Sequence, residues 1–450
     1  MTSFIGQIAV VLILALCILG VFALLVNLFE RNKAYERRLS DLKESNGISS
    51  NWALLVAGSK SWENYRHQAD VAHAYHLLRE NGFLENNIVT MIFDDVANDP
   101  QNPYPGTLYN DDSRRDYYKR LVVDYKGKDV NADTFLHVLE GNGAGKVIRS
   151  GPNDNIFLYY ADHGGVGILG MPVGRLVTRA ELLRVLKAKK NANGYRKLLI
   201  YLEACEGGSI FQDFPNQLDV YAVTASNPFE SSYAVLCSPD LPCLSDEFSL
   251  NWMRDSEFKG IFDRSLHEQF TNARTNTVAS HVSEYGTYEI RNDEIADFQG
   301  SFKTRNTLQR KWNKLSGSLS TNVTISNRMR IQDIPLELGK RNRTKIIEIE
   351  AKREKLIELI REIVRSVVEK TKSKRIIDLF IRNNRSRSHH LCNSLAMQRF
   401  DEKCARFSEN PFAFKYSFVI ANLCEEARWS TPIIESIDAV CENKAIIGVV

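Results

Sequence analysis

Two short apolar segments, each followed at once by a reactive residue, constrain the fold of this chain most. Residues 155–160 (Asn-Ile-Phe-Leu-Tyr-Tyr) lead into Ala-Asp-His-Gly-Gly, and residues 197–202 (Lys-Leu-Leu-Ile-Tyr-Leu) lead into Glu-Ala-Cys-Glu-Gly-Gly. Apolar runs of this length, bounded by glycine, are typical of strands buried on both faces. We therefore expect His163 and Cys205 just past the ends of two buried strands.

The segment between these runs predicts a helix over residues 178–190. Thr178 and Glu181, three residues later, form a capping box ahead of apolar residues at helical spacing. A strand–helix–strand unit is right-handed and its strands are parallel. Ligands bind at the carboxyl ends of such strands, so a histidine and a cysteine at that edge suggest a thiol nucleophile and its base.

The rest of residues 51–300 continues the alternation of strands and helices. Further strands are predicted over residues 52–58, 87–93 and 218–225, and helices over about 65–79, over 132–139 and from 247 onward. No hairpin is expected after Leu244. This pattern predicts an α/β fold with a mostly parallel sheet that helices flank.

The residues around His163 and Cys205 suit a cysteine protease, which needs a thiolate, an imidazole and backbone donors for an oxyanion. The backbone amides of Gly164 and Cys205 are candidate donors. On spacing alone, a buried structural cysteine and a loop histidine explain the pattern about equally well. Glycine-rich residues 141–145 lack the strand and helix that a phosphate-binding loop requires, and we interpret them as a turn.

Charge divides the chain into two parts of opposite sign. The chain is 44% hydrophobic and 25% charged, as in globular proteins. Residues 51–300 hold 24 Lys and Arg against 34 Asp and Glu, a net −10, whereas residues 301–450 hold 29 against 17, a net +12. Docking of the basic part onto the acidic part is the simpler interpretation, and no nucleic-acid-binding module is evident.

Residues 1–30 predict a signal peptide or an N-terminal membrane anchor, followed by a polar stalk over residues 31–50. Residues 4–29 are almost wholly apolar and long enough to span a bilayer. A basic start and a small-residue cleavage site are not evident, which favours an uncleaved anchor. The basic residues that follow favour a cytoplasmic downstream chain, but the cysteines discussed next favour a lumenal one.

Four cysteines in the last sixty residues predict two disulfides and an oxidising compartment. They are Cys392, Cys404, Cys424 and Cys441. Three glycosylation sequons agree with a lumenal chain; they begin at Asn322, Asn342 and Asn384. No zinc-binding spacing is present, and we expect no metal and no cofactor.

Residues 301–345 are polar and weakly periodic, and we interpret them as a linker. Residues 344–382 are strongly periodic, with one apolar stripe among charged residues, and predict a helix or a helix pair packed in a small bundle. Residues 346–450 are therefore predicted to be an all-α domain with disulfides.

Four stretches of sequence, in order, resemble the legumains, which are asparaginyl endopeptidases also called vacuolar processing enzymes. They are residues 62–70 (Trp-Glu-Asn-Tyr-Arg-His-Gln-Ala-Asp), 161–165 (Ala-Asp-His-Gly-Gly), 203–209 (Glu-Ala-Cys-Glu-Gly-Gly-Ser) and 225–233 (Ala-Ser-Asn-Pro-Phe-Glu-Ser-Ser-Tyr). The resemblance runs from about residue 51 to 300 and resumes in the four-cysteine region. It implies a caspase-like fold and a lysosomal or vacuolar peptidase that cuts after Asn, and after Asp at lower pH.

The resemblance also implies roles for single residues. Cys205 would be the nucleophile, His163 the general base, and Asn64 the residue that orients the imidazole. Asp162 matches an aspartate linked in this family to succinimide formation and peptide ligation.

The resemblance places the S1 pocket at Arg66, Glu203 and Asp246, with His67 and Ser232 at its border. This set suits an asparagine side chain, because a carboxamide needs a donor for its oxygen and acceptors for its amide hydrogens. For Arg66 and Asp246, a structural ion pair is a second interpretation that is compatible with the first.

By the same resemblance, the C-terminal region is an activation peptide and a prodomain that caps the active site as an intramolecular inhibitor. We hypothesise that acid weakens the attraction between the two parts, and that the linker is then cut after Asn322, Asn327 or Asn342. The resemblance implies the disulfides Cys392–Cys424 and Cys404–Cys441, whereas the sequence alone allows three pairings.

The sequence departs from the family pattern in a few places, and two related proteins are alternatives. Gly207 stands where the family usually has Ser, and Cys237 with Cys243 suggests a local disulfide that shapes the nonprimed side. A catalytic subunit of the GPI-anchor transamidase shares the dyad, but Asp162 and the four-cysteine tail favour a legumain. A non-catalytic scaffold is disfavoured by the intact catalytic set.

Overall fold

The computed structural model describes residues 50–238, 241–301, 329–330, 343–372, 377–380 and 388–450. From Asn51 to Val450 the chain forms one compact unit. The apolar segment 4–29, the stalk, the three sequons and most of the linker lie outside the described residues. Among the described residues, no helix combines the length and the apolar character needed to cross a membrane.

A six-stranded sheet forms the centre of the first part of the chain, with strand order β11-β8-β7-β3-β1-β2. Five strands are parallel, and only β11 at the edge runs antiparallel to its neighbour β8. The strands are β1 (Asn51–Ala57), β2 (Ile88–Met91), β3 (Asn155–Ala161), β7 (Lys197–Glu203), β8 (Val220–Thr224) and β11 (Ser283–Gly286).

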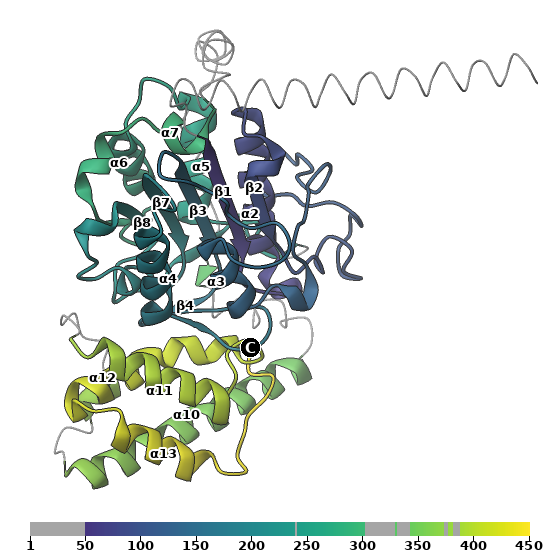
Figure 1. The fold of residues 1–450 in the computed structure, drawn as a ribbon. Helices are drawn as coiled ribbons and strands as arrows, with labels where there is room; N and C mark the ends of the chain where they lie inside the picture. Colours follow the sequence, from purple (N-terminus) through teal and green to yellow (C-terminus); the bar gives the residue numbers. More distant parts are fainter. Residues whose placement is uncertain (1–49, 239–240, 302–328, 331–342, 373–376, 381–387) are drawn as a thin grey trace, which may run out of the picture. The chain divides into compact units, whose positions relative to one another are not determined.

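Helices cover both faces of this sheet (Figure 1). They are α2 (Tyr65–Glu80), α3 (Ala132–Glu140), α4 (Arg179–Asn191), α5 (Glu247–Lys259), α6 (Leu266–Asn276) and α7 (Ala296–Gln299). Alternate residues of β1 enter opposite cores: Leu55 packs in the core that includes residues of α2, α5 and α6, and Leu54 in the core that includes residues of α3 and α4. The prediction of a mostly parallel sheet flanked by helices is confirmed.

The predicted capping box begins α4, because Thr178 Oγ1 accepts from the Glu181 amide and Glu181 bonds back to the Thr178 amide. This cap fixes the start of the helix that crosses from β3 to β7. The two strands pair in register, with Ala161 opposite Glu203. Their carboxyl ends therefore meet at one edge of the sheet.

Two three-stranded sheets were not predicted. One orders β10 (Ser245–Asp246), β9 (Tyr233–Val235) and β12 (Met329–Arg330), and the other orders β4 (Gly164–Gly165), β5 (Ile168–Leu169) and β6 (Val177–Thr178). The antiparallel edge strand β11 was not predicted either; it forms no hairpin, because its partner is the distant strand β8. Segments of two to four residues are too short to show an alternating pattern.

The second part of the chain is all-α and has its own core. Its helices are α10 (Arg343–Thr371), α11 (His390–Lys403), α12 (Ser417–Ala427) and α13 (Thr431–Cys441), with 3₁₀ turns η9 (Ile377–Phe380) and η10 (Pro411–Tyr416). A helix or a helix pair was predicted over residues 344–382; α10 ends at Thr371, where Lys372 takes a left-handed backbone with φ 52°, and η9 follows. The structure joins Cys392 to Cys424 and Cys404 to Cys441, the two pairs that the resemblance implied.

Candidate active site

The ends of β3 and β7 bring the predicted dyad residues to one edge of the sheet. The Asp162 amide, just past β3, donates to the carbonyl of Glu203, the last residue of β7, at 3.1 Å. A Cβ atom at Gly164 would lie 2.6 Å from the carbonyl oxygen of Cys205, so only glycine permits this approach of the two loops. The two residues predicted to supply oxyanion donors, Gly164 and Cys205, are thus packed backbone to backbone.

Asn64 determines which nitrogen of His163 carries the proton. The Asn64 Nδ2 group donates to the Lys60 carbonyl at 2.8 Å, so its Oδ1 faces His163 Nε2 at 2.7 Å. Nε2 must therefore carry a hydrogen, and Nδ1 is left as a base. Burial, and then the Arg66 charge, lower the pKa of His163 to about 3, so the imidazole is neutral in this structure.

Of the cysteines that the structure describes, Cys205 is the one outside a disulfide. Its Sγ lies 3.9 Å from Ser232 Oγ. Burial, and then the Glu206 carboxylate, raise the pKa of the thiol to about 12. The structure therefore holds a neutral thiol near a neutral imidazole, which is a resting pair rather than an activated one.

The residues predicted for the S1 pocket come from three elements and meet in the interior. Arg66 of α2 donates from Nε to Asp246 Oδ1 at 2.8 Å, and both side chains are fully buried. Glu203 at the end of β7 accepts on Oε2 from both the amide and the hydroxyl of Ser249. The two interpretations of Arg66 and Asp246 are compatible, because the ion pair uses only one nitrogen of the guanidinium.

Each of these three side chains keeps one buried polar atom with no hydrogen-bond partner among the described residues. These atoms are Nη2 of Arg66, Oε1 of Glu203 and Oδ2 of Asp246. An unsatisfied buried polar atom is costly, and in native proteins it needs a specific explanation. These one donor and two acceptors are complementary to a ligand group that offers one acceptor and two donors.

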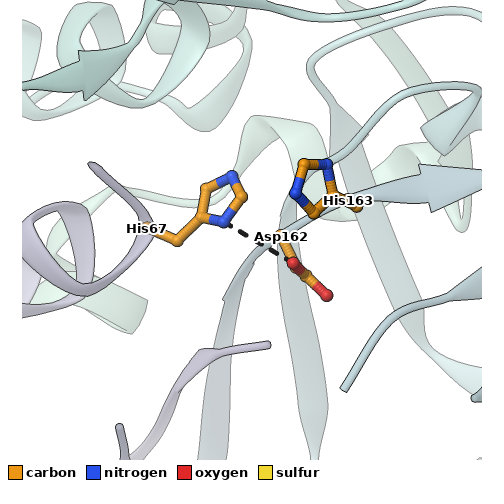
Figure 2. A group of neighbouring side chains, drawn as sticks. All are labelled: His67, Asp162 and His163. Carbon is orange, nitrogen blue, oxygen red and sulfur yellow. Dashed lines mark ion pairs between the residues drawn. The ribbon is translucent and has the colours of Figure 1, made fainter. Parts of the chain in front are cut away.

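His67 and Asp162 lie beside His163 (Figure 2). His67 Nδ1 bonds to Ser59 Oγ at 2.6 Å and lies 3.5 Å from Asp162 Oδ1. One ligand atom from each of the three residues falls within 4.8 Å of the others, a spacing that a metal ion could also use. The group lies beside the dyad, and we interpret it as part of the active site.

The buried carboxyl of Asp162 is held mainly neutral. Burial raises its pKa well above the usual range, while the His163 amide and the Arg66 charge act in the opposite direction. A Cβ atom at Gly170 would overlap the Asp162 carboxyl, so a glycine is required there. The side chain is therefore enclosed between two loops directly behind the dyad.

Sequence reasoning missed three residues that support the site. Ser59 holds His67, Ser249 holds Glu203, and Asp70 lies next to Asp246. Only Asp70 left a signal, because it follows Arg66 by four residues and the two share one face of a helix. Serines at the start of a helix or after a strand are too common to be informative.

Residues of the C-terminal part line the cavity that contains the dyad. This cavity has a volume of about 180 Å³ and is lined by Asn64, His163 and Cys205 together with Phe407, Phe412 and Phe414. The Phe414 ring lies parallel to the His163 ring, with 6.0 Å between centroids and 20° between planes. In this structure the C-terminal part therefore occupies the approach to the catalytic residues.

The contact between the two parts is mainly apolar and hydrogen-bonded. Val166 of the first part belongs to the core of the second, accepts from Asn393 at 2.7 Å and donates to Ser417 at 2.9 Å. Ser408 donates to the Gly174 carbonyl at 3.1 Å. The described ion pairs, in contrast, join residues within one part or within the other.

Near the S1 residues, the structure joins Cys237 to Cys243 in the loop between β9 and β10. β9 begins one residue after Ser232, and β12 pairs with it antiparallel, with Arg330 opposite Tyr233 and Met329 opposite Ala234. One piece of the predicted linker is therefore a strand beside the site. Asn322, Asn342 and Asn384 lie outside the described residues.

A parallel sheet with a histidine and a free cysteine at its carboxyl edge is the arrangement of a cysteine peptidase, and helices of the same chain cover this edge. The peptidase C13 family model matches residues 51–301, and the legumain prodomain model matches residues 344–441. The chain belongs to the peptidase C13 family and carries a legumain prodomain. The predictions of a legumain-like chain and of a cysteine endopeptidase are confirmed.

Curated relatives agree with this membership. The chain is 36% identical to "Hemoglobinase" of Schistosoma japonicum, with 87% of this chain and 92% of that protein covered. It is 34% identical to mouse "Legumain", with the same shares covered. It is 42% identical to the "Vacuolar-processing enzyme beta-isozyme" of Arabidopsis thaliana, over 63% of this chain and 64% of that protein. A caspase-1 structure from Spodoptera frugiperda is a remote likeness, with TM-score 0.34 and 11% identity over 53% of this chain and 87% of that one.

Proposed function

We propose that the chain hydrolyses peptide bonds after Asn, and after Asp at lower pH, and that its C-terminal domain keeps it inactive until acid and autocleavage release it. The observation that carries the specificity is the set of three unpartnered buried atoms on Arg66, Glu203 and Asp246. A carboxamide oxygen accepts from Arg66, and its two amide hydrogens reach the two carboxylates. An alanine side chain leaves all three atoms unsatisfied, and a lysine ammonium offers no acceptor to Arg66 and repels its charge.

The reaction uses the proton arrangement at the dyad. His163 Nδ1 takes the thiol proton of Cys205, and the sulfur attacks the scissile carbonyl carbon. Backbone amides near Gly164 and Cys205 stabilise the oxyanion. The protonated imidazole gives its proton to the leaving amine, and water then hydrolyses the thioester with His163 again as base.

The capped state explains why the full chain rests inactive. Phe414 covers the imidazole, and burial beneath the C-terminal domain favours the neutral thiol. The strand β12 lies on β9, where a substrate backbone beside Ser232 would pair. Removal of these groups opens the cavity to substrate and water.

Three finer proposals follow from the family. Asp162 is the candidate for succinimide formation and for a ligase side activity. Asn322, Asn327 and Asn342 are candidate activation sites. The relatives' names, "Legumain" and "Vacuolar-processing enzyme", support a lysosomal or vacuolar lumen, and residues 4–29 are the candidate membrane anchor.

The test is cleavage of peptides that differ only in the residue before the cut: Asn, Asp, Ala or Lys. The chain is incubated in mildly acidic buffer, and Cys205→Ala is treated in parallel. We expect Asn-selective cleavage that rises as the C-terminal domain is shed and that is absent from the variant. Equal cleavage of the four peptides, or cleavage by Cys205→Ala, would overturn the proposal.

A further inference from the structure

A buried row of polar side chains on α2 lies behind the S1 residues. Arg66, Asp70 and His73 are spaced four and three residues apart, which places them on one helical face. Each is at most 1% exposed. Charged side chains are this buried only when partners satisfy them, so each of the three side chains needs hydrogen-bond or ion-pair partners.

Asp70 accepts two hydrogen bonds, and both bind the same carboxyl oxygen. Its Oδ1 accepts from Asn110 Nδ2 at 2.6 Å and from Ser245 Oγ at 2.7 Å. Its Oδ2 has no donor among the described residues. Asp246 directly follows Ser245, the donor to Asp70, and the two buried carboxyl groups influence each other's pKa. Asp246 Oδ2 also has no hydrogen-bond partner among the described residues, and His67 Nε2, at 3.5 Å, is beyond the usual bonding distance.

Two buried carboxyl groups in contact, each with an unpartnered oxygen, share a proton, because two anions at this separation repel strongly. A single proton between the two Oδ2 atoms satisfies both. We propose that Asp70 is a positioning and specificity-determining residue, which donates this proton to Asp246 and so holds Asp246 as an acceptor for the substrate carboxamide. The proposal deepens, and rests on, the proposed asparaginyl specificity.

The carboxylate of Asp246 has room for all of these bonds. Oδ1 accepts from Arg66, and Oδ2, which lies 3.5 Å from His67 Nε2, has two acceptor positions that Asp70 and the substrate amide can use. Arg66 and Asp70 thus fix the Asp246 carboxylate from two sides. Without the proton, Asp70 and Asp246 would repel, and Asp246 would turn away from the substrate.

The hydrogen bonds behind Asp70 assign a positive charge to His73. Asn110 donates from Nδ2 to the Leu244 carbonyl as well as to Asp70, so its Oδ1 faces His73 Nδ1 at 2.7 Å. Glu257 faces Nε2 of the same ring at 2.8 Å. Both ring nitrogens meet acceptors and must carry hydrogens, so His73 is an imidazolium that fixes the Asn110 amide.

Burial and the neighbouring carboxyl groups favour the protonated form of Asp70. Burial, followed by the charge of Asp246, raises the pKa of Asp70 well above the usual range, and the Ser245 hydroxyl opposes this. The titratable or charged groups around Asp70 and Asp246 are Glu203 of β7, Tyr159 of β3, Arg66, His67 and His73 of α2, and Glu257 of α5.

The first test replaces the carboxyl proton that Asp70 and Asp246 share with an amide hydrogen, which does not dissociate. In Asp70→Asn the amide oxygen keeps the Asn110 and Ser245 bonds and the amide nitrogen donates to Asp246 at every pH. Near pH 5 we expect kcat/KM for the Asn peptide to stay within about threefold of wild type. The alkaline limb of the pH profile, where kcat/KM falls as the pH rises, should move to higher pH by about one unit or more. In Asp70→Ala the donor is gone, and KM for the Asn peptide should rise about tenfold or more with a smaller change in kcat.

A second variant keeps the carboxyl group. Ser245→Ala removes one donor to ionised Asp70, so the alkaline limb should move upward as well, by less than in Asp70→Asn. The matched control is Asp297→Asn on α7, another carboxyl whose pKa burial raises and whose charged neighbours do not include the S1 residues. Full-length chains are activated alike, and their folding is checked by thermal melts of the Cys205→Ala forms.

An alkaline limb that stays at the wild-type pH in both Asp70→Asn and Ser245→Ala would overturn the proposal, as would an equal displacement in Asp297→Asn. If Asp70→Asn does not fold, Ser245→Ala alone decides. Failure of the specificity itself is distinguished in the wild type, which would then show no preference for the Asn peptide.

Discussion

At the scale of single residues, the Asn64 amide determines how the dyad can work. Its bond to the Lys60 carbonyl orients it, and its bond to Nε2 leaves Nδ1 of His163 as the only nitrogen able to take the thiol proton. A base in the wrong tautomer is ineffective even when the ring is correctly placed.

Asn64→Ala should therefore lower kcat about 10- to 100-fold with little effect on KM. Steady-state kinetics with the Asn peptide measure this. Asn64→Asp is the matched variant, because a carboxylate still accepts from Nε2, and it should retain more activity than Asn64→Ala. Similar losses in both variants would contradict a role in choosing the tautomer.

Gly207, which departs from the family pattern, has room for a side chain. A Cβ atom there meets Thr224 and Leu202 at ordinary contact distances of 3.4 and 3.5 Å. The next glycine differs: a Cβ atom at Gly208 would lie 2.2 Å from the Tyr285 hydroxyl and 2.9 Å from Pro228.

Gly207→Ser should change the free energy of unfolding by less than about 0.5 kcal/mol. Gly208→Ser should destabilise the chain by about 1–3 kcal/mol, because backbone must move. Chemical denaturation of the Cys205→Ala forms compares the two. A large loss in Gly207→Ser would mean that the absent side chain matters at this position.

At the scale of elements, the short turn η10 determines access to the dyad. Phe414 on η10 stacks on His163 and packs against Phe407 with ring centroids 4.6 Å apart. The rest of the turn continues into α12, which belongs to the core of the C-terminal domain.

Phe414→Ala should raise the activity of the unprocessed chain, because the ring that covers the imidazole is removed. The assay is cleavage of the Asn peptide before acid treatment, with chain integrity checked on a gel. Phe418→Ala is the matched control, since Phe418 is buried in the same domain but does not line the cavity. Equal activation in both variants would indicate general loosening of the domain instead.

The elements also mark the limits of prediction from sequence. Long apolar runs and the Thr178 cap predict β3, α4 and β7, and their register then places His163 and Cys205 at one edge. The end of α10 was not predictable, because a lysine rather than a glycine takes the left-handed position. The role of Asp70 requires the pairing of α2 with β10, which lies 175 residues away along the chain.

At the scale of the whole molecule, charge accounts for docking less well than the net values of −10 and +12 suggest. Of the basic excess, residues 301–342 hold 9 Lys and Arg against 2 Asp and Glu, a net +7, and residues 343–450 hold 20 against 15, a net +5. The described contact between the domains is instead apolar and hydrogen-bonded. One buried carboxyl of the C-terminal domain lies in this contact.

Asp401 of α11 accepts from the Phe407 amide and from the backbone of Leu176, across the domain contact. Burial raises its pKa to about 6, and these hydrogen bonds, with Arg406 and Arg175, partly offset that effect. Because this shift is relative to a free carboxyl, Asp401 takes up a proton when the chain folds, and its burial disfavours the folded state increasingly as the pH rises toward and above about 6. The partners across the domain contact, Leu176 and Arg175, favour the ionised carboxyl, so protonation of Asp401 weakens these two contacts.

Asp401→Asn should therefore stabilise the full chain at neutral pH by at most about 3 kcal/mol and leave it unchanged near pH 4. Thermal melts of the Cys205→Ala form between pH 4 and 8 measure the difference. Asp438→Asn on α13 is the control, because its partly exposed carboxylate pairs with Arg399 of the same domain. A difference that grows toward acid pH would show the opposite sign and refute the assignment.

Because β12 lies between the candidate cleavage sites, the site of the cut decides which product keeps this strand. Met329 and Arg330 occupy the strand position beside Ser232 while joined to the chain on both sides. A cut after Asn322 or Asn327 leaves this strand attached to the helical domain, and it departs when that domain departs. A cut after Asn342 leaves it attached to the peptidase domain as a tethered competitor, at a high effective concentration that dilution cannot lower. Two cuts only fifteen to twenty residues apart would then yield two enzyme forms from one precursor. One form has the strand position beside β9 free for substrate, and the other still has it occupied by β12.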